Sequence, residues 1–145
     1  MIKRLLITIF LLAPSVYAQA SGKNERLWND ASVYRDEWGV PHIYANNPRS
    51  MAFVFGYAQA EDHLEDMLRA YRVANGRASE IYGEAFIESD TLALRMRHAD
   101  LANEAYKSLD KITQHLCEGF ASGVNSWIIE HPNRTPEWAE GVTPT

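Results

Sequence analysis

Residues 31–45 read ASVYRDEWGVPHIYA, and this stretch has the pattern of a β-hairpin. Two short runs rich in β-branched and aromatic side chains flank turn-forming residues at positions 36–39. Gly39 supplies the positive φ that such a tight turn requires. Pro41 has no backbone N–H, so the second strand begins at or after it, or lies at a sheet edge. An isolated hairpin is marginal in water and the sequence offers no other convincing strand, so this pair needs partner strands.

A helical region is predicted to follow the hairpin, beginning after Pro48. Apolar residues are so dense at positions 51–60 that nearly every face of this helix is apolar, which predicts that other structure covers it on most sides. A regular stripe at helical spacing continues from Glu61, and Gly76 is expected to end the helix in a left-handed cap. Glu65 and Arg69 are expected to form an i,i+4 ion pair.

Two further helices are predicted downstream of a break at Gly83. The first is expected over residues 90–99, and the second is a long helix that Ser108 caps and Pro132 ends. The apolar stripe of the long helix consists of Leu109, Ile112, Leu116, Phe120, Val124, Trp127 and Ile128. Residues 133–145 are Pro-rich and irregular. The predicted fold class is therefore α+β, mostly helical in this segment.

The first twenty residues have the organisation of a secretory signal peptide. Lys3 and Arg4 precede an apolar run at residues 5–12 that is too short to span a bilayer, and small residues at positions 16–20 suit a signal peptidase. We therefore predict a signal peptide at residues 1–20, export to a bacterial periplasm, and no membrane contact for residues 21–145 after signal cleavage. An uncleaved membrane anchor is the alternative.

Composition and charge limit the classes of function. A chain of 145 residues with 46% hydrophobic and 23% charged residues fits one globular domain. The net charge of −5 becomes −7 when the two cations Lys3 and Arg4 leave with the signal peptide, so nucleic acid is not an expected partner. Cys117 is the only cysteine, which excludes an internal disulfide and a multi-cysteine metal site.

No complete catalytic or metal-binding set is evident from residue chemistry. The five histidines lack the spacing of a metal motif. Ser122 stands in Gly-x-x-Ser-Gly rather than in a nucleophile elbow, and its predicted mid-helix position favours a packing role. Four clustered acids are interpreted as charges that compensate the dipole of a helix start, with a cation site or an acid/base pair as the alternative: Glu61, Asp62, Glu65 and Asp66.

Four segments occur in an ordered series: VYRDEWGVPHIYA at residues 33–45, FGYAQAED at residues 55–62, the positions Leu64, Met67 and Arg72, and GRASE at residues 76–80 with Gly83. Together they resemble the opening of the α chain of the penicillin acylase family, which includes penicillin, cephalosporin and acyl-homoserine-lactone acylases. The resemblance is most specific from residue 35 to residue 83 and is looser to the end of the chain.

The resemblance implies a precursor made of a signal peptide, an α segment, a spacer and a long β segment, which cleaves itself to release an N-terminal serine or cysteine. That residue attacks the amide carbonyl of an N-acyl compound while its own α-amino group takes the proton. The implied fold is a four-layer αββα sandwich in which α and β segments interleave. Residues 21–145 would be the N-terminal portion of this domain, with the β segment as partner and with no catalytic residue of their own.

Cofactor and site expectations also follow from the resemblance. The family's calcium-binding carboxylate and acyl-pocket side chains would follow Thr145, so no metal or cofactor is expected in this segment, although the complete enzyme would bind calcium. Seven residues match family positions with structural roles: Gly39, Pro41, His42, Gly56, Gln59, Asp62 and Gly76. Of these, His42, Gln59, Asp62 and Gly76 are expected to shape the α/β contact, with Gln59 and Asp62 bonded to backbone groups near a helix junction.

Two hypotheses from other classes remain open from the residues alone. The first hypothesis is a free-standing secreted helical binding module without catalysis. Such a module would fold cooperatively as a monomer without any partner. A weaker hypothesis is an exported cation-binding protein that uses the acidic cluster.

Overall fold

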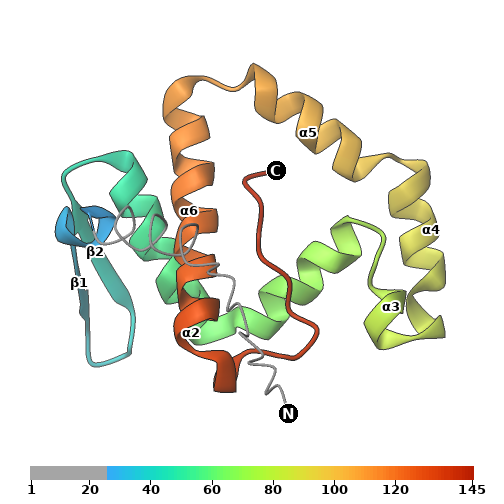
Figure 1. Cartoon of the computed structure of the whole chain (residues 1–145), viewed down its shortest axis with the longest axis horizontal. Coiled ribbons are helices and arrows are strands. Elements are labelled where there is room, and N and C mark those ends of the chain that lie inside the picture. Colours follow the sequence, from blue (N-terminus) through green and yellow to red (C-terminus); the bar gives the residue numbers. More distant parts are fainter. Residues whose placement is uncertain (1–25) are drawn as a thin grey trace, which may run out of the picture.

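A computed structural model describes residues 26–145, which form one two-stranded sheet and a series of helices (Figure 1). The predicted signal peptide lies outside the described residues. Among the helices of the described part, none is both long and apolar enough to cross a bilayer. The predicted class, α+β and mostly helical, is confirmed.

The hairpin forms as the sequence predicts. Strand β1 (Ala31–Arg35) pairs antiparallel with β2 (Pro41–Ala45), in a register that sets Ala31 opposite Ala45 and Arg35 opposite Pro41. Gly39 has a φ of 79°, as the turn requires. The Asp36 carboxylate accepts the backbone N–H groups of Trp38 and Val40 at 3.0 and 2.9 Å. In the described residues the sheet has these two strands alone.

Helix α2 (Pro48–Ala74) is long and bends in its middle. Asn47 caps its start by accepting the N–H of Ser50 at 2.9 Å. His63 has non-helical angles, φ −143° and ψ 29°, so α2 consists of two halves joined at a kink. Gly76, with a φ of 67°, ends the helix as predicted.

Helix α6 (Lys111–Glu130) crosses α2 at very short range. The two backbones approach so closely that a Cβ atom added to Gly56, Gly119 or Gly123 would collide with a carbonyl oxygen of the other helix. Beside this crossing lies the main core, which consists of the buried residues Ala60, Leu64, Leu68, Val124 and Trp127. Helix α6 ends before Pro132, as predicted, but its cap is Asp110, which accepts two N–H groups of the first turn. The prediction of Ser108 as the cap is wrong, because that residue ends the preceding helix.

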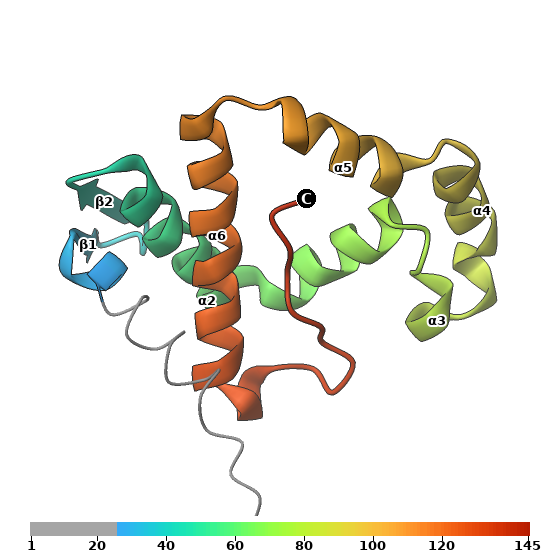
Figure 2. The ribbon, with the colours of Figure 1, turned by 45° about the horizontal axis from the view of Figure 1, so that its top comes forward.

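A series of short helices joins α2 to α6 in an arch: α3 (Ser79–Tyr82), the 3-10 turn η1 (Glu84–Phe86), α4 (Ile87–Arg95) and α5 (His98–Ser108) (Figure 2). The prediction of one helix over residues 90–99 is wrong. The backbone of Arg97 is left-handed, with a φ of 55°, and this residue separates α4 from α5.

The chain after α6 is irregular, as predicted, apart from the 3-10 turn η2 (Pro132–Arg134). It then runs back between α6 and the second half of α2, so the C-terminus lies inside the arch (Figures 1 and 2). Residues 135–145 are called the C-terminal segment below.

Candidate functional site

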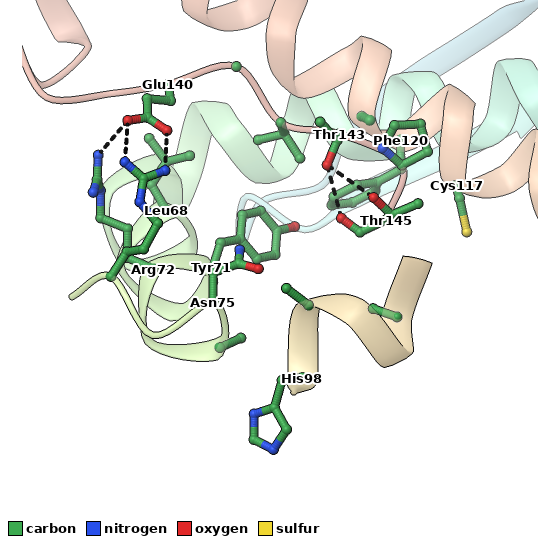
Figure 3. Close-up of a pocket in the computed structure, with 18 of the residues that line it drawn as sticks. Leu68, Tyr71, Arg72, Asn75, His98, Cys117, Phe120, Glu140, Thr143 and Thr145 are labelled. Atoms are coloured by element: carbon green, nitrogen blue, oxygen red, sulfur yellow. Dashed lines mark hydrogen bonds and ion pairs between the residues drawn. The ribbon is translucent and has the colours of Figure 1, made fainter. Parts of the chain in front are cut away.

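An apolar cavity of about 570 Å³ lies between α2, α5, α6 and the C-terminal segment (Figure 3). Each of these elements contributes apolar side chains to its wall, among them Met51, Phe55, Leu68, Ala102, Leu116, Phe120 and Val142. Ligand sites in proteins are hollows of this size with apolar walls and a few polar groups. The cavity is therefore the first candidate for binding.

Two polar side chains lie at the wall of this cavity, the Tyr71 hydroxyl of α2 and the amide of Asn75, the residue that follows α2 (Figure 3). Neither side chain has a hydrogen-bond partner within the described part of the chain. Burial raises the pKa of Tyr71, so its phenol stays protonated at neutral pH and is able to donate a hydrogen bond. The cavity thus offers apolar contact and two hydrogen-bonding groups, but no paired nucleophile and base.

A cluster of ion pairs closes one end of the cavity. Arg72 is buried, with a side chain only 10% exposed, and donates to Glu80 at 2.9 Å and to Glu140 at 3.1 Å. It also donates to the carbonyl of Trp138 and lies over its ring, 5.4 Å from the centroid. Arg77 binds the same two carboxylates, and its hydrogen bonds hold the pKa values of Glu80 and Glu140 below their usual range. The cluster ties the C-terminal segment to the end of α2 and to α3.

A second, shallower hollow of about 500 Å³ lies where the hairpin turn meets the middle of α2. Arg35 spans it, donating to the carbonyl of Gly39 at 2.7 Å and to the side chains of Glu61 and Asp62 at 2.6 and 3.0 Å. These carboxylates raise the pKa of Arg35, chiefly through its hydrogen bond to Asp62. The guanidinium therefore fastens the hairpin to α2.

Three comparisons with known proteins decide the family. The sequence model of the penicillin amidase family matches residues 30–144. The chain belongs to the penicillin amidase family. Penicillin G acylase from Escherichia coli is 32% identical over 113 residues, which are 78% of this chain and 13% of that protein. The acyl-homoserine lactone acylase QuiP from Pseudomonas fluorescens is 30% identical over 120 residues, 81% of this chain and 15% of that protein.

A solved structure agrees with the sequence comparisons. The thermostable penicillin G acylase from Alcaligenes faecalis superposes with a TM-score of 0.71 and 24% identity, covering 79% of this chain and 66% of that chain. At this identity the match shows a shared fold. The predicted resemblance to the penicillin acylase family is confirmed by the family model and the two relatives named above, and the chain spans only 13–15% of the length of those relatives.

The residues that the sequence analysis assigns to family motif positions divide into two groups. Gly39, Pro41, Gln59 and Asp62 line the hollow between the hairpin turn and α2. His42 lies beside them on β2, where its Nε2 is 3.1 Å from Asp36; this hydrogen bond is the main cause of the lowered pKa of Asp36. Gly56 and Gly76 lie elsewhere. The expectation that Asp62 binds backbone groups is wrong, because its carboxylate binds the Arg35 guanidinium.

The acidic cluster of this penicillin amidase chain is divided by the kink in α2. Glu61 and Asp62 precede His63 and bind Arg35, whereas Asp66 follows it and pairs with Arg69 at 2.7 Å. The prediction that Glu65 pairs with Arg69 is therefore wrong. In residues 26–145, no group of three or more histidine, cysteine or acidic side chains is placed to hold a metal ion.

Several structural residues of this penicillin amidase chain were missed or only partly understood from sequence. Ser122 lies within α6 and is half-buried, away from any strand-to-helix turn. Its neighbours Gly119 and Gly123 form the contact with α2, which their four-residue spacing on one helix face could have signalled. Asp90 is buried and accepts the N–H groups of Ala78 and Ser79 at 3.0 and 2.7 Å. Burial raises the pKa of Asp90, but a hydrogen bond from the Ser79 side chain and these two backbone hydrogen bonds outweigh it and lower the pKa.

Proposed function

We propose that this chain is the signal-bearing N-terminal part of an exported acylase, which hydrolyses the linear amide bond of N-acyl compounds together with a β segment of the same precursor. The reaction adds water across the amide and gives a carboxylic acid and an amine. Relatives named as penicillin and acyl-homoserine lactone acylases support two substrate classes, penicillins and N-acyl homoserine lactones; cephalosporins are included by the resemblance alone.

The observation that carries the proposal is the exposed apolar surface of the hairpin. Tyr34 and Tyr44 are each 65% exposed, Trp38 is 83% exposed and Val40 is 51% exposed. An aromatic side chain presents about 150–250 Å² when unfolded, so these three rings leave roughly 400 Å² facing water. At ~25 cal/mol per Å², covering this surface is worth up to about 10 kcal/mol. A patch of this size on a two-stranded sheet favours a docking partner that adds strands.

In this proposal, residues 26–145 position the hairpin and take no part in breaking the substrate amide bond. We propose that Gly39, Pro41, His42, Gln59 and Asp62 hold the hairpin at the angle at which a β segment pairs with it. The Arg35 ion pairs with Glu61 and Asp62 support this role, because they fix the hairpin turn on α2. The nucleophile, an N-terminal serine or cysteine, would belong to the β segment.

In the described part of this chain, no group of three or more side chains is placed to bind calcium. We therefore assign no calcium ligand to residues 26–145 and derive no step of the reaction through the ion. Its place in the complete enzyme, after Thr145, stays a prediction.

The test is expression of the gene with its natural continuation, followed by cell fractionation and N-terminal sequencing of the purified chains. We expect a periplasmic protein whose α chain begins near residue 21 and whose β chain begins with serine or cysteine. It should hydrolyse a chromogenic phenylacetyl amide or an N-acyl homoserine lactone.

A 145-residue chain expressed alone should give no turnover above background. Turnover by this chain alone would contradict the assignment of the nucleophile to the β segment. A monodisperse, cooperatively unfolding monomer without a partner would favour the binding module instead.

A further inference from the structure

The kink at His63 divides α2 into two halves that belong to different parts of the molecule. The first half carries the hairpin, since its buried Phe53 belongs to the cluster on which β2 packs. The second half leads to the arch (Figure 1), where Arg72 binds Glu80 of α3 at 2.9 Å. We propose that the kink is a hinge between these two parts and that Arg134 of η2 keeps it bent.

The sequence around the kink contains none of the residues that ordinarily bend a helix. Residues 60–66 read AEDHLED, without proline, glycine or serine. Sharp kinks arise otherwise at π-bulges, or where a side chain or a water molecule enters the ladder of backbone hydrogen bonds. Helix α2 contains no π-helical turn. The bend therefore requires a contact from outside the helix.

The side chain of Arg134 makes such a contact. In an α-helix, the hydrogen bonds that span residue 63 are those accepted by the carbonyls of residues 60, 61 and 62. Arg134 donates from Nη2 to the Glu61 carbonyl at 3.2 Å, so it occupies one of these three acceptors. A carbonyl that is bound from outside is less available to the N–H of residue 65. The contact thus favours the bent form of α2.

The position of Arg134 is set by the end of α6. Its guanidinium lies over the ring of Trp127, 5.0 Å from the centroid, and this ring is buried, with 2% of the residue exposed. The backbone N–H of Arg134 donates to the carbonyl of His131 at 3.0 Å within η2. The bend of α2 therefore depends on where α6 ends.

A second arginine binds the same turn of α2 from the hairpin. Arg35 pairs with Glu61 and Asp62, the two residues directly before His63. Both arginine contacts lie before the kink, so a change of bend moves the second half, with the arch, relative to the hairpin. The hinge does not depend on the proposed function. Under that function, it would set the angle between the arch and the surface on which the β segment docks.

The experiment compares Arg134→Met with the unchanged protein, each expressed in full from its gene. Methionine keeps an aliphatic side chain and removes the donor. Arg69→Met is the matched control, because the ion pair of Arg69 on α2 lies beyond the kink. Spin-labelled p-acetylphenylalanine replaces Glu37 in the hairpin turn and Glu88 on α4, which are both exposed. Electron paramagnetic resonance then gives the distance between the labels, and hydrogen exchange reports the amides of residues 64–66.

We expect Arg134→Met to straighten α2. Residues 64–74 span about 16 Å at 1.5 Å per residue, so loss of a ~20° bend moves the end of α2 by about 6 Å. The distance between the labels should change by an amount of this order. The amides of residues 64–66 should exchange about fivefold more slowly, because the ladder closes over residue 63. Arg134→Lys, which keeps a donor, should resemble the unchanged protein, and Arg69→Met should alter neither readout.

An unchanged label distance would overturn the inference, and so would unchanged or faster exchange at residues 64–66, because the kink would then persist without Arg134. The same changes in Arg69→Met would overturn it as well, since they would show a general loosening of α2. Should Arg134→Met give no folded protein, Arg134→Gln gives the same readout, because its shorter side chain places no donor at the Glu61 carbonyl. Amide hydrolysis is not among the readouts, so the hinge and the proposed function are refuted separately.

Discussion

Adding one methyl group at Gly123 should separate α2 from α6. The new Cβ atom would meet the carbonyl oxygen of Phe53 and lie 2.8 Å from the backbone nitrogen of Tyr57, closer than real Cβ contacts. Overpacking that side chains can absorb costs about 1–3 kcal/mol, and backbone yields less readily, so we take the upper value of ~3 kcal/mol. Alanine gains about 1 kcal/mol over glycine in helix propensity. The expected net loss for Gly123→Ala is about 2 kcal/mol.

Urea unfolding of the full protein expressed from its gene, followed by circular dichroism, measures this loss. The midpoint should fall, by about 1 M at an m-value of ~2 kcal/mol per M. Gly141→Ala is the matched control, because a Cβ there meets only Asn125 at an ordinary 3.5 Å, and we expect it to change stability by less than ~0.5 kcal/mol. An unchanged or raised midpoint for Gly123→Ala would refute the close helix crossing.

Three further predictions concern the arch and the C-terminal segment. Asp90→Asn should cost about 1–2 kcal/mol in urea unfolding, because the charged acceptor of the Ala78 and Ser79 N–H groups is lost; an unchanged midpoint would show that these hydrogen bonds do not stabilise the fold. Gly76→Ala should cost at least ~1 kcal/mol, since φ is 67° and the Cβ would lie 2.8 Å from Leu94; equal stability would contradict that geometry. The pKa of Glu140 is lowered by Arg77, so its contribution is present above pH ~4.3 and disappears as the pH falls through the lower folded value. Hydrogen exchange of residues 138–142, corrected for intrinsic rates, should therefore accelerate below pH ~4, and Glu140→Gln should accelerate it already at pH 7; a pH-independent rate would contradict the ion pair.

The sequence predicted those parts of the fold that depend on local signals. Gly39 and Pro41 mark the hairpin turn, Gly76 ends α2, and Pro132 ends α6, because glycine permits a positive φ and proline fixes φ and lacks an N–H. The break at Arg97 left no such signal, since arginine rarely adopts a positive φ and does so here within an otherwise helical run.

The site was harder to predict because its contacts are long-range. In the sequence, Arg72 has only the position of a charged residue near the end of a helix. Its burial depends on Trp138 and Glu140, which reach it only when the C-terminal segment has packed against α2. The contacts of Gly56 with α6 and of Gly123 with α2 likewise form only when the chain has returned. The chemistry of a single residue does not identify its long-range partner. The cavity that these contacts enclose was therefore not predicted.

The α2–α6 crossing has a consequence for the order of folding. Gly56 and Gly119 are 63 positions apart, and closing a flexible loop of that length costs about 4 kcal/mol of chain entropy. The arch reduces this cost, because α4 and α5 form from neighbouring residues and stiffen the connection before its ends meet. In a polypeptide that emerges N-terminus first from the ribosome, α2 must wait for the arch and then for α6. The rate at which the arch assembles would thus determine how long the apolar first half of α2 remains accessible to chaperones and proteases.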